Sequence, residues 1–162
     1  MGQKAVVYFS RNGSTRLAAE ILAERLGAKL VELKELKPRR NFLISGFRGV
    51  TKKHSKLSGD PSKEIEDCNT LVLAAPIWAG QANPAMNGFL DMAVLTGKII
   101  YILTIQADPG HAQSDEVLNH YADRVKEAGG SVVGRLALTG ASPGKTAKEK
   151  DLRTALDGWR IE

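Results

Sequence analysis

The chain has 162 residues, of which 43% are hydrophobic, and its formal net charge is +5. This length and composition predict one globular domain, residues 1–162, with a core large enough to fold without metal ions or disulfides. They exclude a membrane-spanning helix and a disulfide framework, because no apolar run is long enough and Cys68 is the single cysteine. We therefore expect a cytoplasmic location, no metal site and a buried, inert thiol.

The first predicted elements are a strand at residues 4–9 and an amphipathic helix that stops at Gly27. The strand is mostly apolar, which is typical of a strand buried on both faces of a parallel sheet. Because the first N–H groups of a helix have no partner within it, the polar loop between the two elements predicts a phosphate site. A capped helix without a ligand is the alternative. The loop consists of Ser10, Arg11, Asn12, Gly13, Ser14 and Thr15.

A second short strand is predicted at residues 29–34, and the positive charge of the chain gathers after it. The rest of the chain is mildly acidic, so the charge does not indicate a protein that binds nucleic acid. The basic segment is interpreted either as a solvated face or as a docking surface for an acidic redox partner. The apolar residues between positions 37 and 69 do not recur with a helix or strand period, which predicts a short irregular helix with a long loop. The seven basic residues are Lys37, Arg39, Arg40, Arg48, Lys52, Lys53 and Lys56.

Three more predicted strands, at residues 70–75, 98–105 and 131–138, alternate with helices. Asn83 followed by Pro84 signals a helix start. Apolar stripes predict two later helices, in which Tyr121 and Trp159 belong to the core. Strands that alternate with helices predict an α/β fold around one parallel sheet.

Two loops resemble those of flavodoxins. The loop at residues 10–15 resembles the flavodoxin phosphate loop, with Asn12 where Thr is usual, and residues 75–84 resemble the first flavin-ring loop of flavodoxin-like proteins. The resemblance covers essentially the whole chain and is closest to short-chain flavodoxins. It implies a flavodoxin-like three-layer sandwich with strand order 2-1-3-4-5, and flavin mononucleotide (FMN) between the first and third strands.

The resemblance also implies the residues of the site. The phosphate loop would hold the phosphate, Trp78 would stack on the flavin ring, and Gly80 would ease rotation of a peptide beside the ring. A core Trp is the alternative for Trp78. A second ring loop, otherwise an ordinary turn, would follow the fourth strand, where Asp108 would lower the flavin potential. The ring-side residues implied are Pro76, Ile77, Trp78, Ala79, Gly80, Gln106, Ala107, Asp108 and Gly110; His111 is interpreted as an exposed loop residue.

The function implied is electron transfer through the bound flavin, with no catalytic acid, base or nucleophile from the protein. Redox proteins are the expected partners. The alternatives are an FMN-dependent NAD(P)H oxidoreductase of the quinone reductase type, and a flavodoxin-fold module without cofactor. Residues 140–146 also resemble a nucleotide-triphosphate P-loop, but only three residues separate the two glycines where that motif has four. An ordinary loop before a helix is favoured there.

Overall fold

Five parallel strands form one sheet of order β2-β1-β3-β4-β5 in the computed structural model, which describes residues 2–37, 54–142 and 144–162. The predicted α/β class and strand order are confirmed, and each strand lies within two residues of its predicted bounds. The strands are β1 (Gln3–Tyr8), β2 (Lys29–Glu32), β3 (Cys68–Pro76), β4 (Ile99–Gln106) and β5 (Ser131–Thr139).

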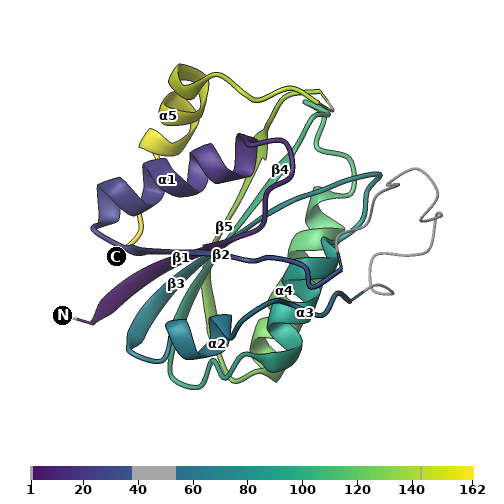
Figure 1. Ribbon diagram of the computed structural model, residues 1–162. Helices are drawn as coiled ribbons and strands as arrows, with labels where there is room; N and C mark the ends of the chain where they lie inside the picture. The colour runs from purple at the N-terminus through teal and green to yellow at the C-terminus, as the bar shows by residue number, and fades with distance from the viewer. Residues whose placement is uncertain (1, 38–53, 143) are drawn as a thin grey trace.

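Helices cover both faces of the sheet (Figure 1). Helices α1 (Ser14–Leu26) and α5 (Glu149–Asp157) pack side by side on one face, and α2 (Pro61–Glu64), α3 (Pro84–Met92) and α4 (Ser114–Glu127) lie on the other. Each face has its own apolar core, which is the arrangement expected of an all-parallel sheet. The predicted three-layer sandwich is therefore confirmed.

Burial follows position in the sheet. Strands β3 and β4 are buried along almost their whole length, whereas the edge strand β2 leaves Leu30 40% exposed. Tyr121 is fully buried between α4 and the sheet, and Trp159 packs edge-on against Tyr101 with ring centres 5.8 Å apart. Both aromatic residues lie in or against the core, as predicted.

The predicted helix signals are also confirmed. Gly27 ends α1 in the left-handed conformation (φ 59°), and its N–H donates to the carbonyls of the last turn. The side chain of Asn83 accepts from the backbone N–H groups of Ala85 and Met86, and Pro84 is the first residue of α3. The hydroxyl of Tyr121 accepts from the N–H of Asn83 at 2.7 Å, which fixes the loop before α3 to α4.

The stretch at residues 37–69 lies only partly within the described residues. From residue 54 onward it forms the short helix α2, whose N-terminus is capped by the carboxylate of Asp60. Glu35 pairs with Leu57 in an isolated antiparallel bridge, which brings the two ends of the basic segment together. Lys37 and Lys56 are exposed there, while the predicted basic residues Arg39, Arg40, Arg48, Lys52 and Lys53 lie outside the described residues.

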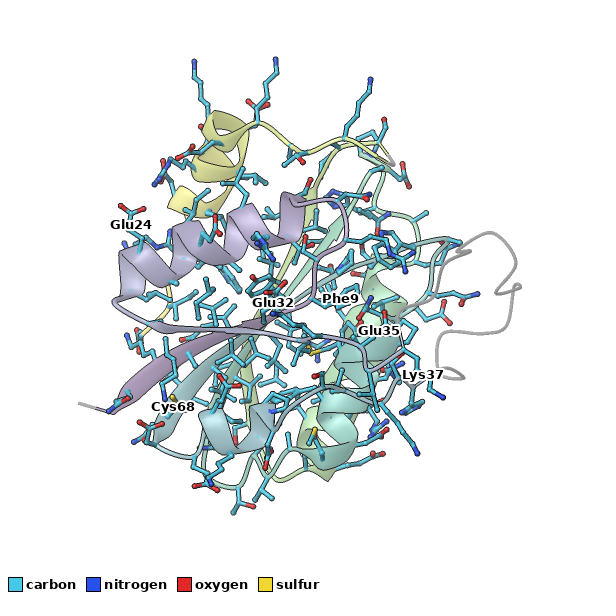
Figure 2. All side chains as sticks on the ribbon, in the orientation of Figure 1. Phe9, Glu24, Glu32, Glu35, Lys37 and Cys68 are labelled. Atoms are coloured by element: carbon cyan, nitrogen blue, oxygen red, sulfur yellow. The ribbon has the colours of Figure 1, made fainter. Side chains whose placement is uncertain are left out.

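Cys68 begins β3 and is completely buried. Burial raises the pKa of its thiol, which agrees with the predicted inert state. Figure 2 places it at the opposite end of the sheet from Phe9, which directly follows β1.

Within the described ranges, no helix has both the length and the apolar character needed to cross a membrane.

Candidate functional site

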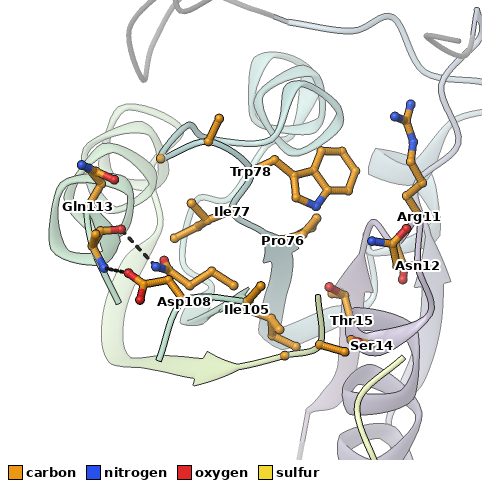
Figure 3. A pocket seen from close by; sticks show the side chains of 18 of the residues that line it. Arg11, Asn12, Ser14, Thr15, Pro76, Ile77, Trp78, Ile105, Asp108 and Gln113 are labelled. Atoms are coloured by element: carbon orange, nitrogen blue, oxygen red, sulfur yellow. Dashed lines mark hydrogen bonds between the residues drawn. The ribbon is translucent and has the colours of Figure 1, made fainter. Parts of the chain in front are cut away.

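A cavity of about 430 Å³ opens at the edge of the sheet where β1, β3, β4 and β5 end (Figure 3). Parallel strands bring all their carboxyl ends to one edge, so loops far apart in the sequence meet there. The lining residues are Ser10, Arg11, Asn12, Ser14, Thr15, Pro76, Ile77, Trp78, Ala79, Gly80, Ile105, Gln106, Ala107, Asp108, Ala112, Gln113, Gly140, Ala141 and Gly144.

The structure brings together all the predicted site residues except Gly13 and Gly110, which do not line the cavity. Sequence reasoning missed part of the wall: Ile105, Ala112, Gln113, Gly140, Ala141 and Gly144. The last three belong to residues 140–146, where the sequence favours an ordinary loop before a helix. The signal that points to them is topological, because the loop after β5 must leave the sheet at the same edge as the loop after β1.

The end of the cavity beside α1 is built to receive an anion. Among the described residues no side chain caps the N-terminus of α1, and its first turn carries no acidic residue. The Ser10 hydroxyl oxygen accepts from the N–H of Gly13 at 3.1 Å, and that of Ser14 accepts from the N–H of Ala147 at 2.9 Å. Each hydroxyl oxygen accepts the backbone N–H through one of its own lone pairs, so its O–H remains available as a donor. Two hydroxyl donors therefore join the partial positive charge of a helix N-terminus.

The position of Gly13, next to the cavity lining, requires a glycine. Its φ is 91°, which L side chains rarely adopt, and a Cβ there would lie 3.0 Å from the hydroxyl oxygen of Thr146. Its N–H positions Ser10. Gly13 thus shapes the loop at residues 10–15 without lining the cavity.

Trp78 forms an aromatic wall of the cavity. Its ring is half-buried, meets the edge of Phe9 with ring centres 6.0 Å apart, and lies 5.2 Å from the guanidinium carbon of Arg11. Pro76 and Ile77 continue the wall with apolar surface. A planar conjugated ring packs well against such a surface.

A tight turn follows Trp78. The N–H of Gln81 donates to the carbonyl of Trp78 at 3.0 Å, and the two residues between them are left-handed, Ala79 at φ 49° and Gly80 at φ 69°. These are the features of a type I′ turn. A Cβ on Gly80 would lie 2.5 Å from the side-chain oxygen of Gln113, so this glycine also permits the two ring-side loops to approach closely.

The loop after β4 is held rigid by its own side chains. The carboxylate of Asp108 accepts from the N–H groups of Ala112 and Gly110, both at 2.9 Å, and these bonds lower its pKa below the usual 3.8. The Gln106 side chain donates to the carbonyl of Ala112 at 3.1 Å and accepts from the Ser114 hydroxyl at 2.9 Å. Gly110 therefore serves the turn around Asp108.

His111, in the same loop, contacts the end of β5 and does not line the cavity. Its Nε2 lies 2.8 Å from the hydroxyl oxygen of Thr139 at the end of β5. It is half-exposed and is not among the lining residues, so it is a loop histidine as expected but is less exposed than the sequence interpretation has it. The contact joins the loop after β4 to β5.

The charges that line the cavity are separated. Arg11, next to Asn12, Ser14 and Thr15, stands on one side, and Asp108, near Gln113, stands on the opposite side (Figure 3). The α1 side favours a negative group, and the Asp108 side disfavours one. The cavity thus suits an elongated ligand with an anionic tail at one end and a flat, uncharged ring at the other.

The chain is similar to several known proteins. The family model described as NADPH-dependent FMN reductase matches residues 8–143. The chain is 20% identical to a candidate flavoprotein from Bacteroides eggerthii, with 100% of both chains covered and a TM-score of 0.71. It is 19% identical to the Trp repressor binding protein of Bacillus subtilis, covering 98% of this chain and 100% of the other with a TM-score of 0.70.

A flavodoxin from Bacillus cereus, flavodoxin 2, is 16% identical with a TM-score of 0.63, and the match covers 96% of this chain and 93% of the flavodoxin. At these identities the structural likeness establishes the fold alone. A comparison with curated protein sequences gave no match.

Proposed function

The chain belongs to the NADPH-dependent FMN reductase family, and from this premise we propose that it is an FMN-dependent oxidoreductase reduced by a nicotinamide nucleotide. The observation that carries the proposal is the polarity of the cavity, with hydroxyl donors and a helix N-terminus at one end and the Trp78 wall at the other. FMN is the cofactor of the family, and its phosphate tail and flat ring match these two ends.

The phosphate would be held by the α1 end of the cavity. Ser10 and Ser14 would donate their free O–H groups, the side-chain amide of Asn12 would add a donor, and the first N–H groups of α1 would complete the set. Arg11 would add positive charge from the same loop. These residues fit a phosphate group because they offer donors without a carboxylate among them.

The ring would be held between the Trp78 wall and the loop after β4. FMN supplies the electron-accepting chemistry when bound. Trp78, Pro76 and Ile77 would exclude water from one side of the ring. Asp108 would keep a fixed negative charge near the other side and so oppose further negative charge there.

Electron transfer to another protein is the second candidate function. The turn at Ala79 and Gly80 supports it, since a peptide that contains glycine can rotate at low cost beside the ring and so tune one-electron steps. A partner of acidic surface would dock near the basic segment. Lys37 and Lys56 are both exposed where the N–H of Leu36 donates to the carbonyl of Lys56 at 2.8 Å.

Anaerobic stopped-flow mixing of the FMN-loaded protein with NADPH or NADH separates these functions. An oxidoreductase loses its flavin absorbance rapidly with a nucleotide alone, and the family predicts NADPH as the faster donor. A carrier keeps its absorbance until a reductase is added. A protein that forms no bound yellow species with added FMN would refute the flavin site itself.

For the carrier, the rate of reduction by an acidic reductase should fall as salt is added, because exposed charges are screened. A rate that does not change with ionic strength would rule out docking at Lys37 and Lys56.

A further inference from the structure

The loop between β5 and α5 closes against the phosphate loop from behind. We refer to its residues Gly144, Lys145, Thr146 and Ala147 as the clasp. We propose that the clasp is part of the phosphate site and that Thr146 is a positioning residue, which orients the phosphate-binding groups without touching the ligand. The proposal rests on the proposed FMN site and adds to it a segment more than 130 residues away in the sequence.

Two hydrogen bonds join the clasp to the phosphate loop. The Thr146 hydroxyl donates to the backbone carbonyl of Asn12 at 2.6 Å, and the N–H of Ala147 donates to the Ser14 hydroxyl oxygen at 2.9 Å. Gly144, in the left-handed conformation at φ 81°, lines the cavity itself. The clasp therefore contacts the loop that precedes α1 at Asn12 and the first residue of α1 at Ser14.

Thr146 acts through one peptide plane. A trans peptide holds its C=O and N–H in opposite directions, so a bond that fixes the carbonyl of Asn12 also fixes the direction of the N–H of Gly13. That N–H donates to the Ser10 hydroxyl oxygen at 3.1 Å. The Ser10 O–H is then left to donate into the cavity. Loss of the Thr146 hydroxyl would let this peptide rotate and release Ser10.

Ala147 acts on the second serine in the same way. Its N–H occupies a lone pair of the Ser14 hydroxyl oxygen, so the O–H of Ser14 is directed to the cavity, which Ser14 lines. Hydrogen bonds in a chain strengthen one another, so an anion that accepts from Ser14 would make its oxygen a better acceptor for Ala147. Phosphate binding should therefore tighten the clasp.

The clasp is anchored by α5. Leu152 and Leu156 are buried against α1, and the guanidinium of Arg25 donates to the carbonyls of Leu156 and Trp159 at 2.7 and 3.0 Å. Because the clasp leads directly into this helix, its position depends on the docking of α5. By linkage, a ligand that tightens the clasp should also stabilise the docked helix.

The test compares Thr146→Val with Thr146→Ser, which keeps the hydroxyl. Thr154→Val is the matched control, since Thr154 lies on α5 and its hydroxyl donates to the carbonyl of Lys150, at 3.0 Å within the same helix. Binding of FMN and of riboflavin, which lacks the phosphate, is measured by quenching of flavin fluorescence. Thr146→Val should raise the Kd for FMN about 3–10-fold, as expected for one lost hydrogen bond, and leave the Kd for riboflavin within about twofold.

Thr146→Ser and Thr154→Val should bind both flavins as the wild type does. Equal weakening of FMN and riboflavin by Thr146→Val would mean a merely structural role and would overturn the proposal. Amide exchange gives a second measurement, because FMN should slow the exchange of the Ala147 N–H in the wild type. Unchanged exchange would also overturn it. A wild-type protein that binds neither flavin would instead refute the proposed function.

Discussion

A glycine lies at each end of α1, and comparing the two separates two effects of a substitution. One effect is the strain of a left-handed backbone, and the other is a contact with the clasp. Gly13 and Gly27 both have left-handed backbones, at φ 91° and 59°. Apart from its chain neighbours, no atom of the described residues lies within 4 Å of a Cβ added at Gly27, whereas at Gly13 the hydroxyl oxygen of Thr146 lies 3.0 Å from the added Cβ. Replacing each by Ala therefore imposes similar strain, but only Gly13→Ala pushes on the clasp.

The expected losses of stability follow from these distances. A left-handed non-glycine residue costs about 1–2 kcal/mol, and the lower entropy of the unfolded chain offsets about 0.4–1 kcal/mol of this. Gly27→Ala should thus destabilise the fold by about 1 kcal/mol. Gly13→Ala should destabilise the fold by about 0.5–1.5 kcal/mol more than Gly27→Ala does, because Thr146 must move and weaken its bond to Asn12.

Thermal unfolding of the FMN-free protein measures both losses. For a chain of this size each kcal/mol of lost stability lowers the Tm by about 2–4 °C. The Tm of Gly13→Ala should therefore be about 1–6 °C below that of Gly27→Ala. FMN binding should weaken only in Gly13→Ala, because Gly27 lies at the far end of the helix. Equal Tm values, or equal FMN affinities, in the two variants would refute the reasoning about the contact between Gly13 and Thr146.

Three other residues yield predictions with separate measurements. Trp78→Ala should weaken binding of FMN and of riboflavin alike, by about tenfold in a fluorescence titration, because the ring loses its stacking surface; a selective loss for FMN would contradict this. Asp108→Asn should raise the midpoint potential of the flavin in a spectroscopic redox titration, since a fixed negative charge is removed, and an unchanged potential would exclude the role. Folding lowers the pKa of Asp108, so its carboxylate stabilises the fold above its usual pKa of 3.8, and this stability is lost as pH falls through the lowered pKa. The urea midpoint of the wild type should therefore drop more between pH 5 and about pH 3 than that of Asp108→Asn. Gly80→Val should change the flavin potential and the Tm together, because the new side chain meets both a left-handed backbone and Gln113; a variant with wild-type values of both would remove Gly80 from the ring site.

Most of the fold could be predicted because its signals are local. The β-branched run at residues 98–105 predicts β4 to within one residue, and the pair Asn83 and Pro84 marks the start of α3. The position of the loop at residues 10–15 and of the Trp78 loop at the cavity could be predicted because each follows a clear strand, and parallel strands place such loops at one edge.

The missed part of the site depends on contacts without a local signal. Thr146 and Asn12 are 134 positions apart, and nothing near either residue in the sequence indicates the bond between them. Gln113 adopts a left-handed conformation at φ 58° although its residue type does not favour one, and its side chain lies against Gly80. Such contacts appear only when the strands have been brought together.

The loop that resembles a P-loop illustrates the same limit. A P-loop surrounds phosphate with its own N–H groups, and the glycine spacing at residues 140–144 is too short for that. In the structure this loop turns at Gly144 and directs Thr146 and Ala147 to the neighbouring loop. A motif search tests each loop alone, whereas a parallel sheet lets one loop position the hydroxyls of another. If the proposed phosphate site is correct, Gly144, Thr146 and the N–H of Ala147 would support it from a loop that a motif search treats separately.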